Sequence, residues 1–273
     1  MSTIAAALAE ARQRIPAAEA RLLLGHLLGR DNAWLEAHRD EALDAAIAQD
    51  YSALLARRAA GEPVAYLLGV REFYGRDFAV TPAVLIPRPE TELLVDIAKE
   101  KLFASDAARI LDLGAGSGCI AVTLALELQW AEVTAVDVSL AALEVARGNA
   151  RRHGATVSFV ASDWYAALPP QRFDLIVANP PYVAAGDPHL SEGDLRFEPA
   201  GALTDHADGL AAIRRIVAEA PRWLNPGGWL FLEHGYDQAE AVQALLATAG
   251  MKDIEQHRDL AGIVRVSGAI ISD

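Results

Sequence analysis

The chain has 273 residues, a formal net charge of −13 and a hydrophobic share of 52%. Its length suits one large α/β domain plus a small one, and its acidity argues against electrostatic tracking of a nucleic-acid backbone. Residues 1–75 hold 8 Lys and Arg against 10 Asp and Glu, and residues 76–273 hold 16 against 27. A single cysteine, Cys119, excludes a disulfide framework and a cysteine-based zinc site. With no signal peptide or bilayer-spanning stretch, we expect a cytoplasmic protein without membrane contact.

Residues 1–62 predict a small helical bundle. Apolar residues recur at helical spacing from Ala20 to Leu28. A longer helix is expected over 40–61, where acidic residues come early and Arg57 and Arg58 come late, as the helix dipole favours. We interpret 1–62 as a separate N-terminal domain.

Residues 63–89 change character and predict a hairpin followed by a stiff connector. Aromatic and β-branched residues flank Tyr74 and Gly75, which is typical of a β-hairpin. Three prolines follow within a few residues, and a helix is expected to begin near Glu90.

Residues 90–273 alternate strand and helix, which predicts a mostly parallel sheet covered on both faces. The candidate strands are 109–114, 132–138, 157–163, 173–179, 228–235, 253–259 and 263–270. The helices between them are expected at 118–129, 139–153, 208–223 and 237–249. The last two strands lie too close in sequence for a crossover helix, so they predict an antiparallel hairpin at one edge.

A glycine loop follows the first of these strands. The stretch LDLGAGSGCI places Gly114, Gly116 and Gly118 where the strand turns into its helix, so backbone N–H groups can approach a ligand closely. Asp137 ends the next strand, 19 residues after Gly118. This separation in sequence suits a carboxylate that accepts hydrogen bonds from ribose hydroxyls. The spacing is not that of a dinucleotide fingerprint, and Asp112 ahead of the loop suits a cationic ligand. These features favour S-adenosylmethionine over NAD.

Trp164 is a further candidate for the same pocket. With Asp163 it follows the third strand, where the carboxyl ends of parallel strands converge on a ligand crevice. We expect its ring to stack on or enclose the adenine of the donor.

The fourth strand ends in Asn179-Pro180-Pro181-Tyr182, a corner with an unusual set of acceptors. The Asn179 side chain and the Pro180 backbone each offer a carbonyl, and the prolines fix the backbone around them. Tyr182 adds a flat ring. Two acceptors and a ring match the two hydrogens and the plane of an amino group attached to a flat system. We therefore expect the corner to orient such a nitrogen toward the methyl group by hydrogen bonding, without a covalent intermediate.

At this point the sequence resembles the peptide-chain release factor glutamine N5-methyltransferases, the HemK or PrmC family. The matching stretches include GVREFYGRDFAV, LIPRPETELLV, ILDLGAGSGCIAV, SDWYAAL, FDLIVANPPYV, RFEPAGAL and LEHG. The corner alone also occurs in adenine and cytosine amino-methyltransferases, whereas PRPETE before the glycine loop combined with RFEP after the corner is more particular.

The resemblance implies a class I S-adenosylmethionine-dependent methyltransferase domain over 90–273, Rossmann-like and seven-stranded. It implies methylation of the glutamine in the Gly-Gly-Gln motif of release factors, with S-adenosylhomocysteine as product and the helical domain docking the protein substrate. The implied donor site is Gly114, Ala115, Gly116, Ser117, Gly118, Asp137, Trp164 and Asn179. The implied acceptor site is Asn179, Pro180, Pro181 and Tyr182, with Asn179, Pro180 and Tyr182 acting in catalysis.

Two alternatives remain open at this stage. An adenine-N6 or cytosine-N4 nucleic-acid methyltransferase explains the corner equally well, but predicts a basic face that three lysines and an acidic catalytic part do not provide. The second alternative is a non-catalytic adaptor that binds release factors or ribosomal protein. Such an adaptor would have no reason to bind S-adenosylmethionine. We expect no direct nucleic-acid binding and no metal, because the seven histidines show no paired spacing. The long segment 183–206 is a candidate lid.

Overall fold

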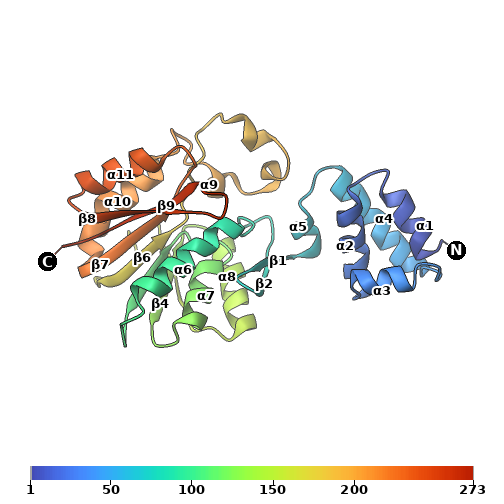
Figure 1. Ribbon diagram of the computed structural model, residues 1–273, viewed down its shortest axis with the longest axis horizontal. Helices are drawn as coiled ribbons and strands as arrows, with labels where there is room; N and C mark the ends of the chain where they lie inside the picture. The colour runs from blue at the N-terminus through green and yellow to red at the C-terminus, as the bar shows by residue number, and fades with distance from the viewer. Residues whose placement is uncertain (1, 273) are drawn as a thin grey trace. The chain divides into compact units, whose positions relative to one another are not determined.

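The computed structural model describes residues 2–272 (Figure 1). The chain divides into two compact units, Met1–Val70 and Arg71–Asp273, which are described separately. The division falls later than the boundary at residue 62 expected from the sequence. It assigns the helix Val64–Leu68 to the first unit, and most of the hairpin and the connector to the second.

The first unit is a helical bundle. Its helices are α1 (Ile4–Ala11), α2 (Ala17–Leu28), α3 (Asn32–Ala37), α4 (Ala45–Ala59) and α5 (Val64–Leu68). In α2, Ala20, Leu23 and Leu24 are fully buried, as the helical spacing predicts. The Tyr51 hydroxyl on α4 donates to the Ala20 carbonyl at 2.9 Å, which fixes α4 against α2.

The second unit begins with a hairpin of β1 (Val70–Phe73) and β2 (Arg76–Ala79), turning at Tyr74 and Gly75 as predicted. The buried Asn149 joins this hairpin to the glycine loop. Its Oδ1 accepts from the Ala79 N–H at 2.8 Å, and its Nδ2 donates to the Ser117 carbonyl at 2.8 Å. The connector is therefore anchored beside the loop that it approaches.

A seven-stranded sheet forms the centre of this unit, in the order β5-β4-β3-β6-β7-β9-β8. Its strands are β3 (Arg109–Leu113), β4 (Glu132–Asp137), β5 (Ser158–Ala161), β6 (Phe173–Ala178), β7 (Leu224–Glu233), β8 (Lys252–Arg258) and β9 (Val264–Ile270). The first five pair in parallel, whereas β9 pairs antiparallel with both β7 and β8. The mostly parallel sheet and its antiparallel edge hairpin are confirmed.

Helices cover both faces of the sheet (Figure 1). One face packs on α6 (Glu92–Lys101), α7 (Cys119–Glu127) and α8 (Leu140–His153), and the other on α10 (Ala211–Trp223) and α11 (Ala239–Thr248). Adjacent residues such as Ile110 and Leu111 belong to opposite cores, because successive side chains of a strand point to opposite faces. The short elements η1 (Pro89–Thr91), η2 (Pro188–Ser191), η3 (Leu195–Phe197) and α9 (Ala200–Leu203) lie in the connecting segments.

The pairing of β3 with β6 positions the site. Leu113 stands opposite Ala178, so the glycine loop and the Asn179 corner leave the sheet at the same level and side by side. Across residues 2–272, no helix has both the length and the apolar character needed to cross a membrane.

Two glycines give a matched test of this packing. At Gly268 on β9, an added Cβ would lie 2.0 Å from the Phe231 ring and 2.5 Å from the Leu230 carbonyl oxygen. At Gly148, inside α8, a Cβ would meet nothing within 4 Å. We expect Gly268→Ala to lower the free energy of unfolding by about 3 kcal/mol, because the clash includes backbone. We expect Gly148→Ala to raise it by about 0.5–1 kcal/mol. Urea denaturation measures both, and equal effects would contradict this packing.

Candidate active site

The glycine loop between β3 and α7 is held against the end of β4. Gly114, Gly116 and Gly118 all have positive φ angles, of 85°, 53° and 80°. An added Cβ at Gly118 would lie 3.0 Å from Cβ of Ala146 on α8, so this position also requires the close approach that only glycine allows. The N–H groups of Gly114 and Ala115 both donate to the Val136 carbonyl, at 2.9 and 2.8 Å.

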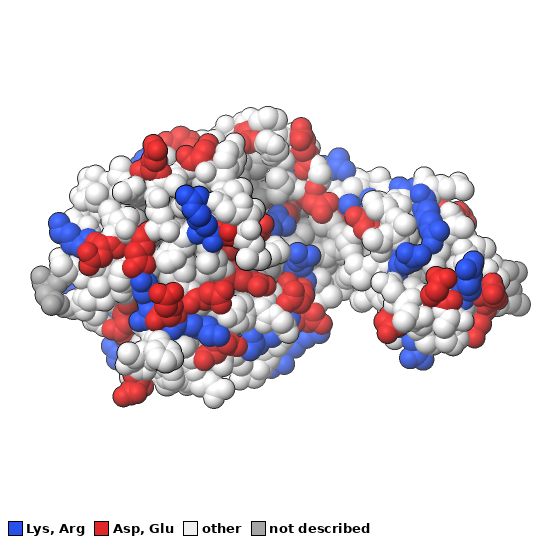
Figure 2. Space-filling view, in the orientation of Figure 1, with Lys and Arg blue, Asp and Glu red and all other residues white. Residues whose placement is uncertain are grey.

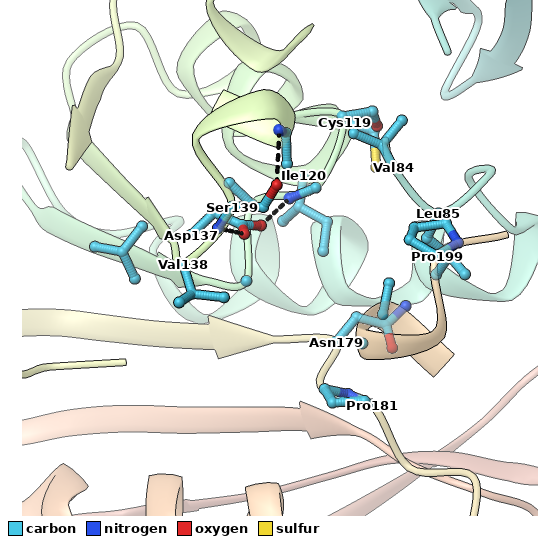
Figure 3. Close-up of a pocket in the computed structure, with 18 of the residues that line it drawn as sticks. Val84, Leu85, Cys119, Ile120, Asp137, Val138, Ser139, Asn179, Pro181 and Pro199 are labelled. Atoms are coloured by element: carbon cyan, nitrogen blue, oxygen red, sulfur yellow. Dashed lines mark hydrogen bonds between the residues drawn. The ribbon is translucent and has the colours of Figure 1, made fainter. Parts of the chain in front are cut away.

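Asp137 lies at the centre of this arrangement. Its Oδ2 accepts from the Gly116 N–H at 2.9 Å and its Oδ1 accepts from the Ser139 N–H at 2.8 Å (Figure 3). Each carboxylate oxygen retains a further lone pair. The side chain can therefore fix the loop and still accept from a ligand hydroxyl.

Asp112 does not contact the cavity, so it cannot bind a cationic ligand directly as the sequence suggested. It is fully buried, and its Oδ2 accepts from the Ala121 N–H at 3.2 Å. Burial raises the Asp112 pKa to about 7. Asp112 lies on β3, an interior strand of the sheet, and faces α7, so its side chain is enclosed between the sheet and that helix.

A cavity of about 260 Å³ opens beside the loop. Its walls come from the connector, the glycine loop, the end of β4, Trp164, the Asn179 corner and the segment around Pro199 (Figure 3). Of the predicted donor residues, Gly114, Ala115, Gly116, Ser117, Asp137, Trp164 and Asn179 line it, whereas Gly118 does not. The lining combines apolar walls with a few polar groups, as in sites for small organic ligands.

Trp164 adopts a left-handed backbone conformation, with φ at 52°. Its ring atom Cζ3 lies 3.6 Å from the position that a Cβ on Gly114 would occupy. The Trp164 ring therefore lies directly beside the glycine loop, on the wall of the cavity.

The Asn179 corner presents two carbonyl acceptors. The Asn179 Nδ2 donates to the Thr91 hydroxyl oxygen at 3.1 Å. Within residues 2–272, no group donates to Asn179 Oδ1 or to the Pro180 carbonyl. Asn179 lines the cavity, so its Oδ1 is open to an external donor, whereas Pro180 is buried and its carbonyl has no donor among the residues described.

Pro181 lines the cavity with Asn179, but Pro180 and Tyr182 are not among the lining residues. The Tyr182 hydroxyl donates instead to Glu233 Oε1 at 3.2 Å, and its carbonyl accepts from Gln238 Nε2 at 3.0 Å. Burial, followed by the Glu233 carboxylate, raises the Tyr182 pKa, so the phenol keeps its proton. Its predicted stacking against the acceptor stays a prediction.

Sequence reasoning assigned no role to Thr91 or Glu233, although the resemblance places the PRPETE segment, which contains Thr91, near the active site. Both are buried, at 2% and 1% exposure, although they lie beside the predicted clamp residues. Burial raises the Glu233 pKa to about 7, and the nearby Thr91 and Tyr182 hydroxyls oppose this rise. The available signal was a lone carboxyl within the apolar run WLFLEHG.

Glu198 joins the connector to the segment after the corner. It is buried, and it accepts from the Ile86 N–H at 2.9 Å and from the Arg88 guanidinium. The two stretches PRPE and RFEP, about a hundred residues apart in sequence, thus meet at the cavity. Pro199 and Ala202 line the cavity beside this contact, so Glu198 joins this part of 183–206 to the opposite wall.

The ends of the segment 183–206 are also held together. The Val183 N–H donates to the Leu203 carbonyl at 3.0 Å, and the Ala185 N–H donates to the Ala207 carbonyl at 2.8 Å. These bonds join the two ends of the segment, and its action as a lid stays a prediction. Among the residues that the structure describes, no group of three or more His, Cys, Asp or Glu could hold a metal ion.

Comparisons with known proteins agree with this architecture. The family model of the PrmC N-terminal domain matches residues 1–69, and that of the methyltransferase small domain matches residues 89–194. The chain is 58% identical to the release factor glutamine methyltransferase of Bordetella pertussis over 94% of this chain and 96% of the relative. It is 50% identical to that of Neisseria gonorrhoeae over 93% of each chain, and 45% identical to that of Salmonella typhimurium over 92% and 91%.

Solved structures support the fold alone. A methyltransferase from Pyrococcus furiosus superposes with a TM-score of 0.56 at 19% identity, over 81% of this chain and all of that one. The catalytic domain of hMettl16 gives a TM-score of 0.60 at 17% identity, over 81% and 82%.

Glu198→Ala tests the contact between the two cavity walls. It leaves the Ile86 N–H and the Arg88 guanidinium without this acceptor, so we expect the free energy of unfolding to fall by about 2 kcal/mol. Glu192→Ala, an exposed change in the same segment, should stay within about 0.5 kcal/mol of the parent. Urea denaturation measures both, and an equally small effect of the two changes would rule out a structural role for Glu198.

Proposed function

This chain belongs to the release factor glutamine methyltransferase family, and we propose that its acceptor is the glutamine of the Gly-Gly-Gln motif, bound at the Asn179 corner. The enzyme is an S-adenosylmethionine-dependent protein-(glutamine-N5) methyltransferase. The donor supplies an electrophilic methyl group on a positively charged sulfur. The sulfur–methyl bond breaks as a nitrogen–methyl bond forms, and the nitrogen releases one proton to solvent, leaving S-adenosylhomocysteine.

The residues around the glycine loop fit the donor. Asp137 can accept from its ribose hydroxyls, while residues 114–118 allow the close approach of a ligand to the backbone. The Trp164 ring, beside Gly114, would cover the adenine. Asn179 lies between this side of the cavity and the acceptor side.

Two carbonyls of the corner, to which no group within residues 2–272 donates, carry the proposal. A glutamine amide nitrogen is a poor nucleophile because its lone pair is delocalised into the carbonyl. With one N–H on Asn179 Oδ1 and the other on the Pro180 carbonyl, the amide plane is fixed. The same oxygens stabilise the positive charge that develops on nitrogen during transfer. Catalysis is thus orientation and preorganised electrostatics.

The remaining residues of the corner support this geometry. Pro180 and Pro181 restrict the backbone so that the two acceptors stay in place. The Tyr182 hydroxyl is anchored on Glu233, which limits how its ring can turn. We propose that the ring flanks the amide once the substrate loop enters.

The protein substrate also accounts for the rest of the chain. We propose that the N-terminal helical domain docks the release factor and that the enzyme acts in the cytoplasm, where translation terminates. We expect no direct nucleic-acid binding: the net charge is −13, and on the face drawn in Figure 2 basic side chains are interspersed with acidic ones.

The direct test uses tritiated S-adenosylmethionine and two acceptors. One is a release factor with an intact Gly-Gly-Gln loop, and the other is the same protein with that glutamine changed to alanine. Label on the first and not on the second is expected. Equal label on both would place the methyl group elsewhere, and label on DNA alone would favour the nucleic-acid alternative.

Asn179→Ala should reduce kcat by about 100-fold or more, because it removes an acceptor and leaves an N–H of the substrate unpaired. Tyr182→Phe keeps the ring and should cost less. Steady-state kinetics with a saturating donor measures both, and a larger loss for Tyr182→Phe would reverse the proposed order.

Asp137→Asn should lower the affinity for S-adenosylhomocysteine about tenfold or more. The new amide would turn a donor toward the Gly116 or Ser139 N–H, so the loop and the ligand lose an acceptor together. Isothermal titration calorimetry measures the effect. Unchanged affinity would remove Asp137 from the donor site.

A further inference from the structure

The Asn179 side chain can serve its proposed role in only one of its two orientations. A carboxamide has an accepting oxygen at one end and a donating nitrogen at the other. The substrate nitrogen also donates, so a flipped Asn179 would place two donors against each other. The orientation of this amide therefore decides whether the corner binds the glutamine.

Thr91 is the residue that contacts the nitrogen end of Asn179, at 3.1 Å. A hydroxyl can accept from a nitrogen or donate to a carbonyl oxygen, so Thr91 alone does not select one orientation. The selection depends on where the hydroxyl proton points. If the proton points away from Asn179, the Thr91 oxygen can only accept there.

Glu233 supplies a reason for the proton to point away. It is buried at the end of β7, its Oε1 accepts from the Tyr182 hydroxyl at 3.2 Å, and its Oε2 has no hydrogen-bond partner of standard geometry within residues 2–272. An ionised carboxylate only accepts hydrogen bonds. A buried oxygen without a partner is costly, and the Thr91 hydroxyl lies near enough to favour the ionised form of Glu233.

We propose that Glu233 is a positioning residue that acts through Thr91. It draws the Thr91 hydroxyl proton toward itself, so that Thr91 accepts from Asn179 Nδ2 and Asn179 Oδ1 faces the substrate nitrogen. Through its other oxygen, Glu233 holds Tyr182. One buried carboxylate thus orients the side chains of both polar residues of the corner, without contacting the reacting atoms. This inference rests on the proposed function, because it concerns the same acceptor amide.

The ionisation of Glu233 links this orientation to pH. A protonated carboxyl can donate to Thr91, which would reverse the hydrogen bond to Asn179. The charged or titratable groups that face Glu233 are Tyr182, Arg265, Glu90 and Cys119. Arg265 favours the ionised form and Glu90 opposes it. Since burial moves the Glu233 pKa to about 7, kcat should rise with pH through the neutral range.

The test compares two changes at one position. Thr91→Val removes the hydroxyl from a buried side chain of nearly the same shape, and Thr91→Ser keeps it. We expect kcat for the release factor to fall about 100-fold in the first and to stay within about threefold of the parent in the second. The KM for the release factor and the affinity for S-adenosylhomocysteine should stay within about threefold in both. Thr248→Val, an exposed change that removes a hydroxyl from α11, should leave kcat unchanged.

Glu233→Gln gives two further measurements. The double change Thr91→Val with Glu233→Gln should cost no more than the larger single change, because both break the same chain. The kcat of Glu233→Gln, measured from about pH 6 to about pH 9, should lack the neutral rise of the parent. The difference between the two profiles is the measurement, because Asp112 titrates in the same range in both proteins.

The possible outcomes separate the two proposals. If the parent enzyme labels no release factor, the proposed function fails and the inference fails with it. If the parent is active but Thr91→Val has parental kcat, the inference alone is wrong. It is also overturned if the kcat losses of Thr91→Val and Glu233→Gln multiply in the double change, or if Glu233→Gln keeps the parental pH profile of kcat. A Thr91→Val variant that loses only affinity for the donor would overturn it as well. Thermal unfolding of each variant establishes that a lost activity is not a lost fold.

Discussion

The parallel pairing of β3 with β6 is the constraint on which the site depends. With Leu113 opposite Ala178, the glycine loop and the Asn179 corner emerge from neighbouring strands at the same edge of the sheet. Since the carboxyl ends of parallel strands face one way, the two segments share one cavity. Asp137 then ties the loop to β4, so three adjacent strands fix the donor side and the clamp together.

Polar contacts between segments distant in sequence join the remaining walls of the cavity to the sheet. The Asn179 side chain reaches Thr91 on the connector, and Glu198 reaches the Ile86 N–H from the other side of the cavity. These groups are buried or nearly so, where an unpaired donor or acceptor is costly. Glu198 therefore holds the connector in place beside the cavity. The prolines of the connector lack backbone N–H groups, so its backbone has fewer donors to satisfy.

The sequence predicted what depends on local patterns. Strand and helix alternation gave the sheet, and Gly114, Asp137 and Asn179 were found because loop glycines and strand-end polar residues mark such sites. The roles of Thr91 and Glu233 were not predicted, because they depend on contacts 88 and 51 residues away, with Asn179 and Tyr182. The interpretation of Asp112 failed for a related reason. Sequence spacing does not distinguish a side chain that faces a cavity from one that is buried between the sheet and a helix.

The corner alone does not determine what is methylated. Its two carbonyls match any flat amino group, whether on glutamine, adenine or cytosine. Selection must therefore come from the walls, and here these are aliphatic and proline residues such as Leu85, Pro87 and Pro199, joined through Glu198. Trp164, the aromatic residue of the lining, stands at the glycine loop, on the side proposed for the donor. A base-binding site stacks its guest between flat faces, whereas an aliphatic passage suits a flexible side chain on a glycine-rich loop. We propose that this wall, joined through Glu198, helps the corner to select a glutamine side chain over a planar base.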